Sequence, residues 1–172
     1  MPDWRLRRAG PDDAAAVALV SGSTFLETYA GMLPGRDIVA HCGRNGADAY
    51  AGFAADPRVV LTVAEHPDGG APVGFTLLAP PDLPIGVGPD DLELRRIYAL
   101  ATTYGTGLGW ALMTRAIEDA RGLGAKRLLL GMNKLNHRAH TFYERQGFAV
   151  IGERIFVVGD TPNQDFILAR AI

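Results

Sequence analysis

Three glycines alternate in the segment Tyr104-Gly105-Thr106-Gly107-Leu108-Gly109, which separates an apolar stretch from an amphipathic one. Glycine carries no side chain, so a ligand can approach the backbone closely at such a position. The first turn of a helix leaves its N–H groups without partners inside the helix, and the helix dipole favours an anion there. The segment therefore predicts a cradle for the phosphates of a cofactor.

Two common phosphate-binding loops differ from this segment. The dinucleotide fingerprint needs a glycine at its sixth position, which, counted from Gly105, is Trp110, and an indole there would block close helix packing. The ATP-binding P-loop ends in Gly-Lys-Ser/Thr, whereas this chain has no lysine between Glu93 and Lys126. Alternating glycines alone are also compatible with an ordinary loop and helix cap. The cofactor assignment therefore depends on the residues around the loop.

The residues that follow form a second motif, made of Asn136, Ala139, the pair Phe142-Tyr143 and the pair Gly147-Phe148. Together with the glycine loop and the strand before it, this motif resembles the GCN5-related N-acetyltransferase superfamily without a gap over Glu93–Phe148. The resemblance implies an enzyme that transfers an acetyl group from acetyl-CoA to an amine. One position departs from the family pattern, because Tyr104 replaces the usual Arg or Gln. A side-chain contact to the pyrophosphate is then expected to be lost, while the backbone N–H cradle remains.

The resemblance also implies a fold and a set of cofactor contacts. The fold is α/β (α+β), a single domain with a mixed, mostly antiparallel sheet flanked by helices. Its central strands, Leu92–Leu100 and Lys126–Met132, are expected to open like a V so that the pantetheine arm can lie between them. Asn136 would contact the cofactor, and it also suits a helix N-cap. The other implied cofactor-binding residues are Ile97, Tyr98 and Ala99 on the strand, and Gly105, Thr106, Gly107, Leu108, Gly109 and Trp110 in the loop.

Acyl transfer needs a base for the attacking amine and an acid for the departing thiolate. The Phe-Tyr pair of the family implies that Tyr143 is the acid near the cofactor sulfur, and the alternative is a tyrosine that only packs between helix and sheet. Glu93 is the predicted base, acting through water, and the alternative is a carboxylate that neutralises Arg95 or Arg96. Strand alternation would place Glu93, Arg95 and Ile97 on one face of the sheet.

Two other sets of residues are not predicted to take part in catalysis. A second base position of the family, five residues before Asn136, is occupied by Gly131, which favours Glu93 or a base that is only a chain of water molecules. His137 and His140 have a spacing that could bind a metal, but no third ligand is apparent nearby. No metal site is therefore predicted.

The acceptor is less well defined by the sequence. Phe25, Thr28 and Tyr29 recur at helical spacing where the family shapes its acceptor pocket, although a core stripe would show the same pattern. The chain looks like the branch that includes bacterial spermidine/spermine N-acetyltransferases. This looser resemblance rests on the tail segments Phe156–Asp160 and Asp165–Leu168 together with Thr24-Phe25-x-x-Thr28-Tyr29 and Leu130-Gly131. A group of acidic residues near the central strand would suit a cationic amine or would only be solvated: Asp82, Asp90, Asp91 and Glu93.

Three functions are compatible with these observations. The first is N-acetylation of a primary amine of a small molecule, with a polyamine as one candidate. The second is the same reaction on a protein lysine or N-terminus, which would need a wide cleft between the first helices and the last hairpin. The third is a non-catalytic module that binds acyl-CoA, in which Tyr104 marks a degenerating site. The retained Asn136 and Tyr143 argue against the third.

Strands and helices alternate along the chain, which indicates a mixed α/β architecture. The pattern predicts a helix from the turn after Gly10 to about Ala30, and a second helical stretch from about Arg36 to Ala55 that is loosened by glycines. The expected strands are Trp4–Arg8, Val59–Ala64, Val73–Ala79, Leu92–Leu100, Lys126–Met132, Phe148–Val158 and Asp165–Ala171, and the later helices are Gly107–Gly122 and Asn136–Gln146.

Composition is that of an ordinary globular enzyme and excludes several classes of protein. The 172 residues, 48% hydrophobic and 21% charged, are expected to form one domain over residues 1–172. A net charge of −2 without a basic run argues against a nucleic-acid partner. The single Cys42 excludes an internal disulfide framework. With neither a signal peptide nor a membrane-spanning stretch, the expected product is a cytoplasmic monomer or homodimer.

Overall fold

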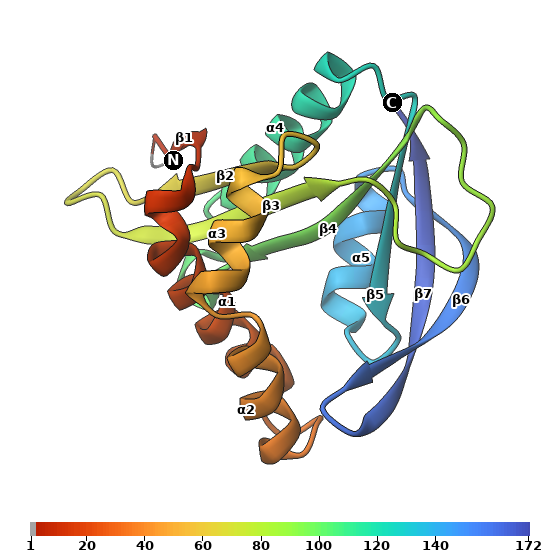
Figure 1. Cartoon of the computed structure of the whole chain (residues 1–172), viewed down its shortest axis with the longest axis horizontal. Helices are drawn as coiled ribbons and strands as arrows, with labels where there is room; N and C mark the ends of the chain where they lie inside the picture. Colours follow the sequence, from red (N-terminus) through yellow and green to blue (C-terminus); the bar gives the residue numbers. More distant parts are fainter. Residues whose placement is uncertain (1–2) are drawn as a thin grey trace.

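The computed structural model describes residues 3–172 and arranges them as a seven-stranded sheet with helices against both faces (Figure 1). The order of the strands across the sheet is β1-β2-β3-β4-β5-β7-β6. The strands are β1 (Arg5–Arg8), β2 (Val60–Glu65), β3 (Pro72–Ala79), β4 (Asp91–Ala99), β5 (Arg127–Asn133), β6 (Ala149–Val158) and β7 (Thr161–Ala171). The helices are α1 (Ala14–Tyr29), α2 (Gly35–Arg44), α3 (Ala47–Ala55), α4 (Leu108–Gly122) and α5 (His137–Arg145), with short 3-10 turns at Pro11–Asp13 and Ala101–Thr103.

The sheet splits between β4 and β5. These two strands run parallel and pair over three positions only, from Asp91 opposite Arg127 to Glu93 opposite Leu129. The other neighbouring strands pair antiparallel. Beyond Glu93 the two strands diverge (Figure 1), which confirms the predicted mixed, mostly antiparallel sheet with a V-shaped opening.

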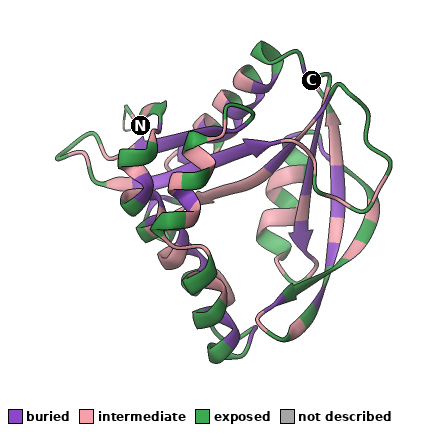
Figure 2. Cartoon of the chain, in the orientation of Figure 1, coloured by how far each residue is buried: buried purple, intermediate pink, exposed green. Residues whose placement is uncertain are grey.

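The two faces of the sheet are covered by different helices. On one face, Val17 of α1 and Tyr50 of α3 pack on Phe75 and Leu77 of β3. On the other face, α4 and α5 cover the residues that alternate with these along the strands. Figure 2 shows the consequence, with buried residues concentrated along the central strands and on the sides of the helices that face them.

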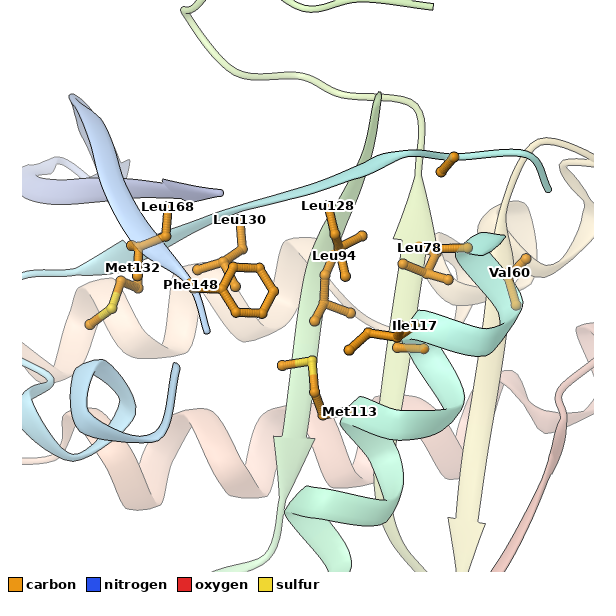
Figure 3. Close-up of a cluster of buried hydrophobic side chains, with 13 residues drawn as sticks. Val60, Leu78, Leu94, Met113, Ile117, Leu128, Leu130, Met132, Phe148 and Leu168 are labelled. Atoms are coloured by element: carbon orange, nitrogen blue, oxygen red, sulfur yellow. The ribbon is translucent and has the colours of Figure 1, made fainter. Parts of the chain in front are cut away.

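Helix α4 forms because its apolar residues recur at helical spacing. Leu112, Met113, Ala116 and Ile117 are all buried, and Met113 and Ile117 point from α4 toward Leu94 (Figure 3). Burying a side chain of this size stabilises the fold by about 1.5–3 kcal/mol. This cluster joins β4 and β5 at the closed end of the V, so the open end is free to hold a ligand.

Two segments differ from the sequence-based expectation. The single helical stretch expected over 36–55 is wrong, because α2 ends at Arg44 and α3 begins at Ala47. The side chain of Asn45 donates to the carbonyl of His41 (2.8 Å), and Gly46 is extended, so the chain changes direction there. The last strand begins at Thr161 rather than Asp165, since a tight turn with Gly159 at φ +59° joins it directly to β6.

Strand β4 carries a β-bulge at Arg95. Leu94 lies opposite Leu78 and Arg96 lies opposite the adjacent Leu77, so Arg95 has no partner on β3. A bulge reverses the alternation of side chains that follows it. The predicted grouping of Glu93, Arg95 and Ile97 on one face is therefore wrong. Instead, Glu93 shares the face of α1 and α3 with Arg96 and Tyr98, while Ile97 packs on the side of α4.

Candidate active site

A cavity of about 910 Å³ lies at the split between β4 and β5. Its volume falls within the range of sites for small molecules and cofactors. Side chains from α1, β4, the glycine loop and α5 meet there, although these segments are far apart in the sequence. The predicted site residues that line it are Phe25, Thr28, Tyr29, Glu93, Ile97, Tyr98, Ala99, Gly105, Gly107, Gly109, Trp110, Asn136 and Tyr143.

The glycine loop has the backbone geometry of an anion-binding turn. Gly105 and Gly107 have φ of +77° and +88°, a region that favours glycine, and Gly107 is the N-cap of α4. The first hydrogen bond within the helix runs from the N–H of Ala111 to the carbonyl of Gly107 (3.0 Å). The N–H groups that precede Ala111 in the first turn can therefore donate to a ligand.

Thr106 and Leu108 do not present their side chains to the cavity. The hydroxyl of Thr106 donates to the carbonyl of Thr103 (2.6 Å), and the N–H of Thr106 donates to the same carbonyl (3.2 Å). The side chain of Leu108 is fully buried in the core. Thr106 therefore holds the shape of the loop, and Leu108 anchors α4 while its backbone N–H belongs to the first turn.

Asn136 is the helix cap predicted from the sequence, and its predicted contact with the cofactor stays a prediction. It is the N-cap of α5, where its side-chain oxygen accepts a hydrogen bond from the N–H of Ala139 (3.1 Å), and it lines the cavity. The helix cap is thus one role that the structure shows. The position of Asn136 in the cavity wall would also allow a contact with a ligand.

Tyr143 reaches the cavity from α5. Its ring packs against Phe142 and Phe148, with centroids 5.5 and 5.9 Å away, so it is also part of the helix–sheet packing. Burial raises the pKa of the Tyr143 phenol above its ordinary value, and the neighbouring Tyr98 adds to this shift. The phenol therefore keeps its proton throughout the neutral range, as a proton donor must.

Glu93 lies in the wall of the cavity and is only 3% exposed. Its Oε2 accepts a hydrogen bond from the N–H of Asp82 (2.9 Å) and lies 3.4 Å from the Arg95 guanidinium. Arg96 turns away from it and donates to the hydroxyl of Tyr50 (2.7 Å) and to Asn45 (2.6 Å). Of the two arginines considered from the sequence, Arg95 is thus the partner of Glu93.

The part of the cavity wall where the acceptor is predicted to bind is aromatic. Phe25 stacks on His41 with centroids 4.1 Å apart and contacts Tyr29 at 4.6 Å. Burial lowers the pKa of His41 to about 4, and Arg96 acts in the same direction, so this imidazole is neutral at pH 7. Burial also raises the pKa of Tyr29 to about 12. These groups form an uncharged part of the cavity wall.

The sequence did not identify Arg154 and Asp165 as site residues. Arg154 of β6 forms an ion pair with Asp165 of β7 (3.1 Å), and both side chains line the cavity although they are only 16% and 5% exposed. A Cβ at Gly131 would lie 2.5 Å from the Arg154 guanidinium, so the glycine makes room for it. The sequence held one clue to this arrangement. Gly131 stands at the second base position of the family and has no side chain, so a side chain from another strand must fill the space beside it.

The described part of the chain contains neither a metal-binding cluster nor a membrane-spanning helix. No group of three or more His, Cys, Asp or Glu side chains in residues 3–172 is arranged to hold a metal ion. His140, one of the two spaced histidines, stacks on Phe166 instead. None of the helices in residues 3–172 has the length and apolar character needed to cross a bilayer.

Comparison with known proteins agrees with this geometry. The model of the acetyltransferase (GNAT) family matches residues 36–148. An uncharacterised N-acetyltransferase of Mycobacterium tuberculosis is 32% identical over 161 residues, which cover 93% of this chain and 98% of that protein. Another uncharacterised N-acetyltransferase, from Lactobacillus delbrueckii, is 36% identical over 86 residues, which cover half of each chain.

Solved structures share the fold. The PaiA N-acetyltransferase of Thermoplasma acidophilum, solved in complex with coenzyme A, superimposes with a TM-score of 0.80 at 17% identity and 99% coverage of both chains. The ribosomal-protein-S18-alanine N-acetyltransferase of Escherichia coli gives a TM-score of 0.71 at 18% identity, covering 98% of this chain and 94% of that one. With its family model, its relatives and its split sheet in agreement, the chain belongs to the GNAT family of acetyltransferases, which use acetyl-CoA.

Proposed function

We propose that this protein is an N-acetyltransferase that transfers the acetyl group of acetyl-CoA to a primary amine of a small molecule. The observation that favours a small acceptor is a bridge between the first helices and the last hairpin. Asp37 of α2 is 2% exposed and accepts hydrogen bonds from the hydroxyl of Thr161 and the N–H of Asp160 (3.3 Å). A peptide acceptor would need a wide cleft at this place, so the bridge supports a small amine.

The residues of the cavity fit the cofactor. The edge of β4 beyond Glu93 is released from β5, which leaves backbone groups at Ile97–Ala99 available to the pantetheine amides. The positive φ values of Gly105 and Gly107 shape the loop toward phosphates, and the first turn of α4 supplies N–H donors. Asn136, Gly109 and Trp110 complete the wall of this part of the cavity.

The reaction can then be assigned to two side chains of this chain. Acetyl-CoA supplies an activated acyl group, and the acceptor amine must be neutral to attack it. Glu93 would accept the proton of the amine through water, from its position in the cavity wall. Tyr143 would donate its phenolic proton to the departing sulfur, from its position in the cavity wall on α5. Glu93 and Tyr143 belong to opposite faces of the sheet, and both line the cavity at the split.

The acceptor amine is less well defined than the cofactor. A polyamine remains a candidate, supported by the resemblance of the tail segments and by the exposed carboxylate of Asp82 at the cavity. The other two cavity carboxylates, Glu93 and Asp165, are already paired with arginines. Cytoplasmic location and a monomeric or dimeric state stay predictions.

The test is an amine panel assayed with acetyl-CoA, with free thiol release as the readout and a reaction without amine as the blank. Polyamines, monoamines, amino acids, lysine peptides and peptides with a free N-terminus would be compared. We expect thiol release with at least one small primary amine. Turnover with peptides alone would contradict the proposal, and binding of CoA without turnover on any amine would favour the non-catalytic module.

A further inference from the structure

The position at which the glycine loop departs from its family pattern has a partner on α5. Tyr104 stands where an Arg or Gln is usual, and it is 42% exposed. Nη2 of Arg138 donates a hydrogen bond to the Tyr104 hydroxyl (2.7 Å), and the Arg138 guanidinium carbon lies 3.8 Å from the centroid of the Tyr104 ring. The cation is thus stacked on the residue that begins the loop, although 34 residues separate the two in the sequence.

The charge of Arg138 is not neutralised within the described chain. Two other arginines of the cavity, Arg95 and Arg154, pair with Glu93 and Asp165. For Arg138, no carboxylate of residues 3–172 lies within 4.0 Å. Arg138 also lines the cavity together with Gly105, Gly107 and Asn136. A positively charged group therefore stands beside the N–H donors of the loop with its own charge free to meet an anion.

We propose that Arg138, held in place by Tyr104, binds the pyrophosphate of acetyl-CoA and so replaces the side chain that the loop itself lacks. A guanidinium carries five N–H donors in a planar fork, and the bond to Tyr104 uses one of them. Stacking on an aromatic ring limits the rotamers of a long side chain and leaves the other donors free for phosphate oxygens. In this proposal, Arg138 of α5 supplies the positive charge that the loop lacks at position 104.

The test is the affinity for CoA by titration calorimetry, measured without any acceptor amine. Arg138→Gln should weaken CoA binding by about tenfold or more, which is the effect of losing a charge-assisted hydrogen bond. Arg121→Gln is the matched control, since Arg121 is an exposed arginine in the last turn of α4. It should bind CoA as the unchanged protein does. Equal affinity of Arg138→Gln and the unchanged protein would overturn the proposal.

Two further measurements separate the pyrophosphate from other parts of the cofactor. With 3′-dephospho-CoA the loss in Arg138→Gln should persist, and its disappearance would assign Arg138 to the 3′-phosphate instead. With S-acetylpantetheine, which carries no phosphate, competition against CoA should give the same affinity in both proteins. An equal weakening toward S-acetylpantetheine would mean a general distortion of the cavity and would also overturn the proposal.

Moving the cation back to the loop gives a positive test. In the double variant Tyr104→Arg with Arg138→Gln, the arginine occupies the place that is usual in the family pattern, and part of the CoA affinity should return. If the double variant bound CoA as weakly as Arg138→Gln alone does, the proposal that Arg138 replaces a loop side chain would be contradicted. Because every readout is binding of the cofactor, a failure to find an acceptor amine would leave these results unaffected.

Discussion

Asp91 and Arg127 face each other at the point where the two central strands meet. They are the first of the three paired positions of β4 and β5, and the carboxylate accepts hydrogen bonds from Nε (2.8 Å) and Nη2 (2.6 Å) of the guanidinium. Asp91 is buried, and its Oδ2 also accepts a bond from the N–H of Gly88 (2.7 Å). This two-point ion pair holds the closed end of the V, beyond which the strands part to form the cavity.

Asp91→Asn should therefore destabilise the fold. The Arg127 hydrogen bonds lower the pKa of Asp91, with the N–H of Gly88 acting in the same direction. A lowered folded-state pKa contributes stability that is present above the unfolded value of about 3.9 and is lost as pH falls through the folded value. Urea unfolding should show a deficit of about 1–3 kcal/mol at pH 7 that shrinks in acid.

The neighbouring pair of Asp90 and Lys126 (2.9 Å) provides the control for that measurement. Both side chains are at least half exposed, and exposed ion pairs contribute little. Asp90→Asn should thus unfold at nearly the same urea concentration as the unchanged protein. A deficit for Asp91→Asn that stayed constant down to pH 2 would show that its carboxylate charge is not the cause.

Gly107→Ala should lower the affinity for CoA. A Cβ would crowd the approach of the phosphates, and φ of +88° is a strained conformation for alanine. Gly124→Ala is matched for strain, since Gly124 has φ of +84° and lies in the turn after α4. Thermal unfolding should show a similar loss of stability in both variants, while calorimetry should show weaker CoA binding only in Gly107→Ala. Unchanged CoA affinity in that variant would refute the phosphate cradle.

Tyr143→Phe should lower turnover by about 10²–10⁴-fold with little change in acetyl-CoA affinity. The substitution keeps the ring that packs between Phe142 and Phe148 and removes only the phenolic hydroxyl group. Because burial raises the pKa of this phenol, the unchanged enzyme keeps the proton at alkaline pH, and the defect should persist there. Steady-state kinetics with the best amine of the panel would measure it. Full activity would leave thiolate departure without an acid from this protein.

Glu93→Gln should reduce turnover most at low pH. Glutamine can still accept the bonds from Asp82 and Arg95, so the local structure is expected to remain while the proton acceptor is lost. At high pH the acceptor amine is already neutral and needs no base, so the defect should shrink. The ratio of kcat/KM between the two proteins across pH is the measurement. An equal loss at every pH would mean that Glu93 acts only through its ion pair with Arg95.

The sequence alone was sufficient to predict the fold and two of the segments that line the cavity. The glycine loop and the Asn136–Tyr143 motif are short segments whose geometry is set locally, by positive φ values and by a helix cap. Strand and helix periodicity gave the positions of β4, α4, β5 and α5 to within about two residues, because burial on one face imposes a repeating pattern.

The direction in which side chains point, and the residues with which they pair, depended on contacts between segments that are far apart in the sequence. The bulge at Arg95 reversed the expected face of Ile97 because β3 pairs with β4 one residue out of step, and no local pattern in β4 encodes that register. Arg154 fills the space over Gly131 from β6, and Arg138 meets Tyr104 from α5. Such contacts exist only once the sheet and helices have packed. The sequence by itself thus determined the elements and the free N–H groups of the glycine loop, whereas the tertiary structure decided which charges line the cavity and which are already paired.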